Sequence, residues 1–139
     1  MNMDEQDIQD SVSESNLKFG SITEAIIRCA FEVINELGVG FLESVYEKAL
    51  AIALQEKGLK VLCQHPIQVH FRDRVVGAFC ADIFVEHKVI VELKAGKAMA
   101  PEHQAQIINY LKATGIEVGL LINFGSPRLE YKRFTRNKR

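Results

Sequence analysis

Three charged side chains lie in a stretch of the chain that is otherwise apolar. Asp82 stands in one hydrophobic run, and Glu92 and Lys94 stand in the next one, within the segment VVGAFCADIFVEHKVIVELKAG. Such strands usually carry valine, isoleucine or threonine at these positions, because a buried carboxylate is unfavourable by several kcal/mol unless it is paired or binds a metal. The three charges therefore indicate a functional site, and the chemistry that they fit best is metal-dependent cleavage of a phosphodiester bond.

The expected strand register brings the two carboxylates together. A turn around His87 places Asp82 directly opposite Glu92, with Cβ atoms about 5 Å apart on the same face, and Lys94 shares the face of Glu92 because side chains alternate along a strand. Two carboxylates this close repel each other, so the pKa of one should rise. A divalent cation between them removes the repulsion, and hard oxygen ligands suit Mg²⁺ or Mn²⁺. A surface acid pair with a salt-bridged lysine fits these residues equally well.

A helix expected at residues 101–114 adds polar groups. His103, Gln106 and Tyr110 lie on one of its faces, three and four residues apart. Their imidazole, amide and phenol could contact a phosphate or orient the water on a metal ion. The alternative is a half-exposed helix whose histidine caps its first turn.

A second helix, expected at residues 42–57, offers a carboxylate. Glu43, Tyr46 and Leu50 form one stripe along it, which puts Glu43 on the apolar side. The alternative is that Glu43 only interacts with the helix dipole at the start of the helix.

The elements that must position these residues follow from periodicity and turn signals. A capping box at Ser21 and Glu24 opens the first helix, and Pro66 predicts that part of the first strand is an edge or a bulge. Residues 59–94 predict an antiparallel meander because polar turns separate their apolar runs. In chain order we expect helices at 21–37 and 42–57, strands at 59–71, 75–85 and 88–94, a helix at 101–114, a strand at 117–123 and a short last strand at 129–134.

Composition places these elements in one domain of an ordinary globular protein. The chain has 139 residues, of which 47% are hydrophobic and 25% are charged. No apolar run approaches the ~20 residues that cross a bilayer, and no signal segment opens the chain, so we expect a cytoplasmic protein without a membrane partner. We predict a disordered acidic leader at residues 1–19, a single domain at 20–134 and a basic tail at 135–139.

Charge is concentrated at the two ends of the chain. Residues 1–19 hold five acids and one lysine, whereas residues 127–139 hold six bases and one acid. The basic end could bind phosphates, or it could be a solvated tail. The cysteines show no metal-binding spacing and lie in apolar runs, so we predict that all three are small buried hydrophobic residues: Cys29, Cys63 and Cys80.

Several motifs in order resemble those of a known family. Residues 40–46, GFLESVY, match the signature of the bacterial G-x-x-E-x-x-Y proteins, which are assigned to the PD-(D/E)XK nuclease-like superfamily. The resemblance extends over residues 21–134 and includes ELGVGFLESVYEKAL, the Asp82 and Glu92-Leu93-Lys94 pair, and EHQAQIINYLKATG. An isolated E-x-K would be a weak signal, but four motifs in order are specific. The resemblance implies a restriction-endonuclease-like mixed sheet core of order α-β-β-β-α-β, which agrees with the elements expected above. We therefore expect an α/β fold of the α+β type, with helices flanking a mixed central sheet in the order α-α-β-β-β-α-β-(β).

The resemblance also implies roles for the site residues. Metal ligands for Mg²⁺ or Mn²⁺ would be Asp82, Glu92, Glu43 and the backbone carbonyl of Leu93. Catalytic residues would be Lys94, Glu43, Gln106 and Tyr110, the last two resembling the Q-x-x-x-Y of RecB-like exonucleases. The proline that gives the superfamily its name is replaced by Ala81, which leaves the neighbouring ligand intact. The four-cysteine cluster of some RecB-like relatives is missing, so no iron–sulfur cluster is expected.

The leading hypothesis is a Mg²⁺-dependent nuclease acting on DNA, with RNA left open as a substrate. Weaker candidates for nucleic-acid contact are His103, Lys97, Arg133 and Arg136. Cutting both strands of a duplex would require a homodimer or two binding events. The alternative is a non-catalytic nucleic-acid-binding or accessory module: the small size of the domain favours it, whereas the presence of all three charged residues argues against it.

Overall fold

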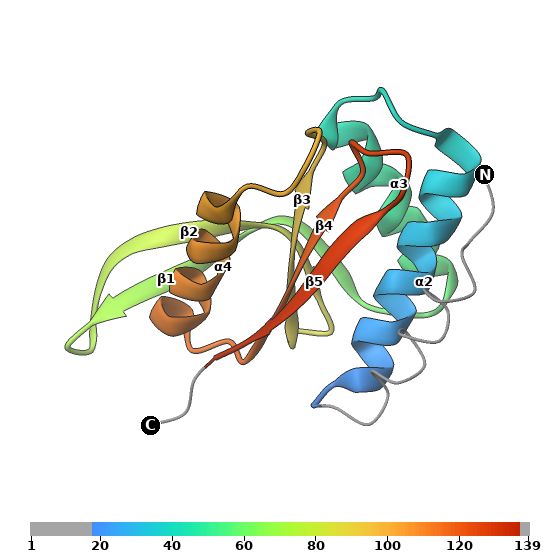
Figure 1. The fold of residues 1–139 in the computed structure, drawn as a ribbon. Helices are drawn as coiled ribbons and strands as arrows, with labels where there is room; N and C mark the ends of the chain where they lie inside the picture. The colour runs from blue at the N-terminus through green and yellow to red at the C-terminus, as the bar shows by residue number, and fades with distance from the viewer. Residues whose placement is uncertain (1–17, 137–139) are drawn as a thin grey trace.

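The fold is seen in a computed structural model that describes residues 18–136 (Figure 1). Most of the predicted acidic leader and the end of the predicted basic tail lie outside these residues. None of the helices within this range is long and apolar enough to cross a membrane.

The order of helices and strands is the predicted one. The elements are α2 (Gly20–Leu37), α3 (Glu43–Glu56), β1 (Val61–Phe71), β2 (Arg74–Val85), β3 (Val89–Lys94), α4 (Pro101–Thr114), β4 (Val118–Asn123) and β5 (Glu130–Thr135). The short last strand is therefore present, and most predicted boundaries agree within one or two residues.

The strands form one mixed sheet in the order β1-β2-β3-β4-β5. Neighbouring strands are antiparallel except for β3 and β4, which are parallel. Parallel neighbours need a long crossover connection, and α4 supplies it. The crossover places the residues after β3 and those after β4 at the same edge of the sheet.

Helices cover both faces of the sheet (Figure 1). The core on the α2 and α3 side takes Val91 and Leu93 from β3, whereas the core on the α4 side takes Ile90 together with Ile107 of α4. Side chains alternate along β3, so Glu92 and Lys94 lie on the α4 side. The packing of α4 depends on Gly119 of β4, because a Cβ there would stand 2.9 Å from Ile107.

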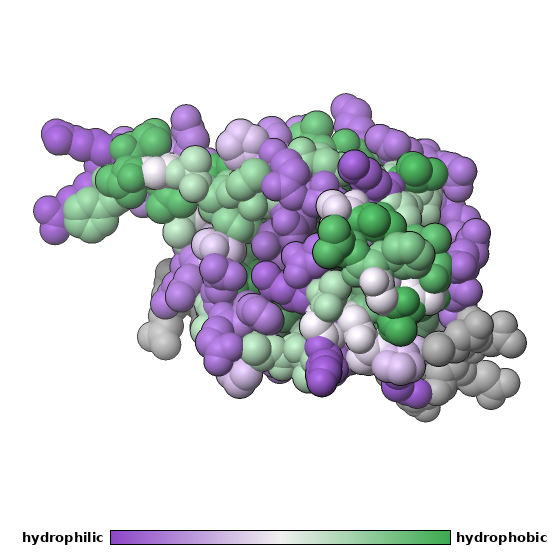
Figure 2. All heavy atoms as spheres, turned by 90° about the horizontal axis from the view of Figure 1, so that it is seen from above, coloured by the Kyte–Doolittle hydropathy of each residue, from purple (hydrophilic) through white to green (hydrophobic). Residues whose placement is uncertain are grey.

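The β1–β2 hairpin extends beyond the rest of the sheet as an arm (Figure 1). Seen from above in Figure 2, this arm carries both hydrophobic and hydrophilic side chains. Its strand β1 is an edge strand, as Pro66 predicts, and the irregular pairing lies further along, between Val69 and His70. Two of the three cysteines, Cys63 and Cys80, are exposed on this hairpin and only Cys29 is buried, so the predicted burial is wrong for two of them. These two cysteines are exposed because the hairpin extends beyond the helices that would cover it, although the sequence around them is apolar.

The predicted capping box does not form. Helix α2 begins at Gly20, one residue earlier, after Phe19 in a left-handed conformation, and no side chain caps it. Phe19 packs against the core, so burial of its ring fixes the start of the helix. The carboxylate of Glu24 accepts a hydrogen bond from Arg28 instead.

Candidate active site and metal centre

Asp82 and Glu92 lie where β2 and β3 separate. The ladder pairs Ile83 with Val91, which is the predicted register, and stops one residue short of the two acids. Beyond this point the side chains take over the hydrogen bonding. The Asp82 amide donates to Oε2 of Glu92 at 3.1 Å, and the Leu93 amide donates to Oδ2 of Asp82 at 2.8 Å. The two carboxylates thus satisfy backbone donors that the diverging strands leave unpaired.

The predicted common face of the two acids is not what the structure shows. Ala81 packs on the α4 side and Ile83 packs on the opposite side, although both would share a face in a regular strand. The alternation slips at Asp82, across from Gln64, whose φ is 49°. Asp82 consequently lines a pocket on the α3 side, whereas Glu92 lies on the α4 side, and each carboxylate accepts a hydrogen bond from the backbone of the other strand.

The Glu92 carboxyl group is buried, with only 9% of the residue exposed. Desolvation, the neighbouring charge of Asp82 and the charge of Glu43 raise its pKa, in that order of size, to a net value of about 8. The Asp82 amide and the Lys94 ammonium group oppose this rise. The predicted upward shift for one member of the acid pair is therefore confirmed, and the charge of Lys94 acts on the same group.

An acidic pocket of about 240 Å³ adjoins Asp82. It is lined by Glu43, Ser44, Glu47, Gln64, Asp82 and Leu93. Glu43 is the first residue of α3 and Glu47 lies one turn later, so the start of this helix brings two carboxylates to the pocket.

Gln64 is a site residue that sequence reasoning missed. Its Nε2 donates to Glu47 at 2.6 Å and to Oδ1 of Asp82 at 3.2 Å. This amide therefore bridges α3 and β2 and fixes the direction of the Asp82 carboxylate. No local pattern marks Gln64, whereas the spacing of Glu47, four residues after Glu43, could have pointed to a second carboxylate.

Tyr46 fixes the loop that leads to Glu43. Its buried hydroxyl donates to the Gly38 carbonyl at 2.6 Å and accepts from the Phe41 amide at 3.3 Å. Its ring stacks on Phe124 at 4.7 Å between centroids. Sequence reasoning found Tyr46 as part of a motif but gave it no role. Its role in the structure is to hold the chain before the pocket.

Replacing Tyr46 with phenylalanine should lower the free energy of unfolding by about 1–2 kcal/mol, because it removes both hydrogen bonds and leaves the Gly38 carbonyl without this donor. Urea denaturation followed by circular dichroism measures the change. Ser21→Ala, which removes an exposed hydroxyl from α2, is the control for the loss of a hydroxyl. An unchanged unfolding midpoint in Tyr46→Phe would show that the loop is held by other contacts.

Asn123 holds the segment that follows Lys94. This fully buried side chain at the end of β4 donates to the Gly96 carbonyl at 2.9 Å and accepts from the Gly96 amide at 3.1 Å. The Phe124 amide donates to the carbonyl of Lys94 at 2.8 Å. These bonds fix the backbone at the Lys94 carbonyl and at Gly96, so the position of this lysine depends on the neighbouring strand β4. Sequence reasoning missed Asn123, although a polar residue at the end of an apolar strand could have pointed to it.

Helix α4 contributes Tyr110 to the site. Its ring stacks on Phe79 at 3.6 Å between centroids, and burial together with the charge of Glu92 raises the pKa of its phenol. Gln106 lies one turn earlier on the same face and is exposed. At the start of the helix, Nδ1 of His103 accepts from the Ala100 amide at 3.4 Å, so this imidazole caps the helix.

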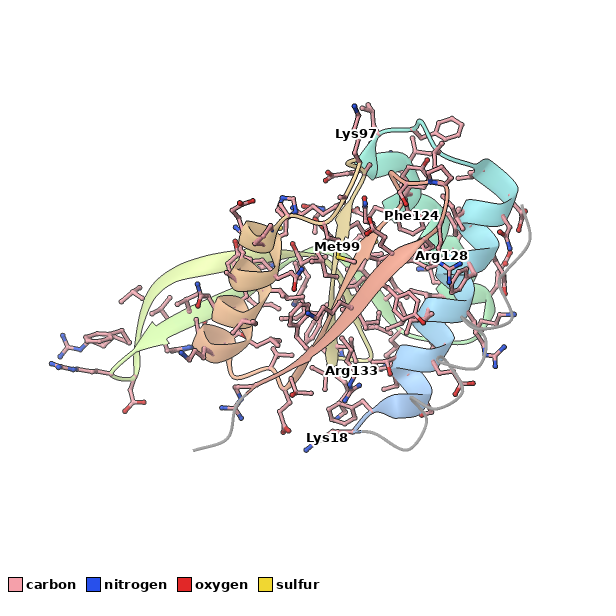
Figure 3. All side chains as sticks on the ribbon, in the orientation of Figure 1. Lys18, Lys97, Met99, Phe124, Arg128 and Arg133 are labelled. Atoms are coloured by element: carbon pink, nitrogen blue, oxygen red, sulfur yellow. The ribbon has the colours of Figure 1, made fainter. Side chains whose placement is uncertain are left out.

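The basic candidates do not gather at one place. Lys97 is exposed in the loop after β3, three residues beyond Lys94. Arg133 lies at the opposite end of the molecule in Figure 3, where it donates to the Lys18 carbonyl at 2.8 Å. Arg136 follows β5, and its amide donates to the Glu117 carbonyl. Of these three residues, Lys97 alone follows directly from the strand that carries the acidic site.

Comparison of the sequence with models of protein families identifies one family that matches nearly all of the described residues. Residues 20–134 match the family model of the PD-(D/E)XK nuclease superfamily. The chain belongs to this superfamily. A comparison with curated proteins gives no match.

Two solved structures share the restriction-endonuclease-like PD-(D/E)XK fold, which confirms the predicted fold class. The crystal structure of SSO0001 has a TM-score of 0.51 and 12% sequence identity, over 96% of this chain and 76% of that chain. The crystal structure of LHK-Exo in complex with dAMP has a TM-score of 0.51 and 14% identity, over 94% of this chain and 75% of that chain. At such identities the likeness establishes the fold alone.

The donor set of this PD-(D/E)XK protein suits a hard cation. Within residues 18–136, no group of three or more histidine, cysteine or acidic side chains already stands in a metal-binding cluster. The acidic pocket is lined by three carboxylates, by the hydroxyl of Ser44 and the amide of Gln64, and by Leu93. Oxygen donors of this kind fit Mg²⁺ or Mn²⁺ and do not fit softer metals. Ligation by Glu43, Asp82 and Glu92 together would require their side chains to turn toward one point.

Proposed function

We propose that the protein is a Mg²⁺- or Mn²⁺-dependent nuclease that hydrolyses phosphodiester bonds, with DNA as its main substrate and RNA as the alternative substrate. The observation that carries the proposal is the acid pair at the separating ends of β2 and β3. There the carboxylates of Asp82 and Glu92 accept hydrogen bonds from backbone amides, the pKa of Glu92 is raised to about 8, and Lys94 lies on the strand of Glu92. Membership of the PD-(D/E)XK nuclease superfamily supports it.

Three carboxylates and one carbonyl are the proposed ligands. Asp82, Glu92 and the backbone carbonyl of Leu93 would hold the ion, and Glu43 would bind it directly, through water, or as a ligand of a second ion. Such an ion neutralises phosphate charge and lowers the pKa of water, which supplies the nucleophile. The raised pKa of Glu92 fits this role, because a buried carboxyl group with like charges beside it gains most from a cation.

The other polar groups act on the substrate. The Lys94 ammonium group would orient the attacking water and stabilise the negative charge that develops on the phosphorus oxygens. From α4, Gln106 and Tyr110 would steady the scissile phosphate, with Tyr110 near Glu92 as its pKa shift indicates. His103 and Lys97 are weaker candidates for contacts with the phosphate backbone of the nucleic acid. Arg133 and Arg136 would contact only a substrate long enough to extend away from the acid pair.

Within the superfamily we assign the chain to the G-x-x-E-x-x-Y proteins. The support comes from the motif itself, since Gly40 has a φ of 110° and Tyr46 holds the loop before Glu43. A cytoplasmic location and a homodimer for duplex cleavage stay predictions from the sequence.

A second candidate function is a nucleic-acid-binding or accessory module without turnover. One observation favours it: both carboxylate oxygens of Asp82 already accept hydrogen bonds, one from Gln64 and one from the Leu93 amide. A metal ligand at this position would have to exchange or share these bonds.

The test combines metal binding with cleavage. Calorimetric titration of the purified protein with Mn²⁺ should show binding that Asp82→Ala abolishes, and the same substitution should abolish cleavage of single- and double-stranded DNA. Asp73→Ala, which removes an exposed aspartate in the turn of the β1–β2 hairpin, is the matched control and should change neither. Wild-type protein that binds Mn²⁺ but cuts neither DNA nor RNA would favour the accessory module, and absence of Mn²⁺ binding would exclude the metal centre.

A further inference from the structure

An exposed apolar surface lies beside the acidic pocket. The loop between α2 and α3 presents Phe41, which is 46% exposed, and Leu42, which is 76% exposed. Other exposed apolar side chains of this segment are Leu37, Val39 and Val45. Figure 2 shows a hydrophobic surface over the end of α2 and the start of α3, next to a strip of hydrophilic side chains.

The loop is held in place, although its side chains are exposed. The Tyr46 hydroxyl bonds both to Gly38 and to the Phe41 amide, and the Phe41 ring meets the Tyr46 ring edge-on at 6.1 Å between centroids. Tyr46 is in turn stacked on Phe124. The apolar surface is therefore fixed before any ligand arrives, which lowers the entropy that binding would cost.

The chemistry and position of this surface favour a nucleobase as its ligand. Leu42 directly precedes Glu43, which lines the acidic pocket with Asp82. The loop between Glu36 and Glu43 contains no charged residue, so a phosphate backbone gains nothing by lying on it. A substrate whose phosphate reaches the pocket carries bases next to that phosphate, and the faces of unpaired bases stack well on aromatic and apolar side chains.

We propose that Phe41 and Leu42 form a platform for an unstacked nucleobase next to the scissile phosphate. The proposal rests on the proposed nuclease function and narrows its substrate to single strands and frayed ends. A base inside a duplex is stacked on both sides and offers no face to such a platform.

The test measures binding to single-stranded oligonucleotides that carry one 2-aminopurine, with Ca²⁺ replacing Mg²⁺ so that binding can be followed without relying on cleavage. Phe41→Ala and Leu42→Ala should each weaken binding about tenfold and reduce the fluorescence change of the base analogue. An oligonucleotide with abasic positions should bind the wild-type protein weakly. Its affinity should equal that of the unmodified oligonucleotide for the two alanine variants. Phe71→Ala, which removes a 58% exposed phenylalanine at the tip of the hairpin, is the control and should bind like the wild type.

The variants must remain folded for this comparison. Leu42→Ser changes a side chain that is mostly in solvent and places serine at the N-cap position of α3, where its hydroxyl can cap the helix, so its melting temperature should be at least that of the wild type. Phe41→Leu keeps an apolar contact with Tyr46. Both should still weaken single-strand binding, Leu42→Ser more than Phe41→Leu. Equal binding of normal and abasic strands, or an equal loss in Phe71→Ala, would overturn the platform.

Failure of the platform and failure of the nuclease function give different results. Duplex DNA cut in an Asp82-dependent way, with Phe41→Ala and Leu42→Ser as active as the wild type, would overturn the platform alone. Absence of both cleavage and single-strand binding in the wild type would overturn both. Loss of a protein partner in the same variants, with oligonucleotide binding unchanged, would identify the surface as a protein-docking site and overturn the proposal.

Discussion

Replacing Lys94 with alanine is expected to reduce phosphodiester cleavage by a factor of about 10²–10³ and to leave Mn²⁺ binding in place. The ammonium group lies on the strand of Glu92, and its charge lowers the pKa of Glu92, so it acts on a group that we propose as a metal ligand. Its carbonyl is bonded by the Phe124 amide and the next segment is held by Asn123, which fixes its backbone. The substitution should therefore remove the charge without moving the loop.

The measurement is a single-turnover cleavage assay paired with calorimetric titration of Mn²⁺. Lys97→Ala is the matched control, because it removes an exposed lysine three residues later in the same segment. We expect at most a few-fold loss for Lys97→Ala, through weaker contact with the phosphate backbone. If Lys94→Ala cuts as fast as the wild type, then Lys94 has no part in the chemistry. If it also loses Mn²⁺ binding, its role is to hold the acid pair in place.

The features that sequence reasoning predicted correctly depend on local patterns. The order of the elements follows from periodicity and turn residues, and the register of β2 and β3 follows from a short polar turn around His87. The raised pKa of Glu92 comes mainly from burial of its carboxyl group in an apolar strand, and the charge of the neighbouring Asp82 adds to the rise.

The features that were missed depend on contacts between distant segments. Gln64 becomes a site residue only because the strand alternation slips at Asp82 and its own φ is positive. Asn123 acts on a loop 27 residues earlier in the chain. The capping box failed for the same reason, since burial of Phe19 outweighs a local hydrogen-bonding motif worth about 1 kcal/mol. Local sequence patterns carry no information on contacts between distant segments that outweigh local preferences.

The stability of the protein is expected to fall as the pH rises from about 5 to 8, with Glu92 as the main cause. The folded protein raises the pKa of this carboxyl group to about 8 from its ordinary value of 4.5. Between these two values the folded state keeps a proton that the unfolded state has released. The free energy of unfolding therefore decreases with pH, by up to about 1.4 kcal/mol per unit for a single group. Above the folded pKa both states are ionised and the contribution of Glu92 stops changing.

Glu92→Gln should remove this dependence and stabilise the protein at pH 8, while abolishing cleavage. Glutamine is uncharged at every pH and its carbonyl oxygen can still accept the hydrogen bond from the Asp82 amide. Urea denaturation of both proteins at pH 5.5 and pH 8 measures the effect, and Glu36→Gln, an exposed acid on α2, controls for the substitution itself. Addition of Mn²⁺ should stabilise the wild type at pH 8, because a bound cation favours the ionised carboxylate, and should have little effect on Glu92→Gln. If Glu92→Gln and the wild type are equally stable at pH 8, then solvent screens the charge of Glu92 and ionising it does not destabilise the folded protein. The case for a cation at this site would then rest on Asp82 and Glu43 alone.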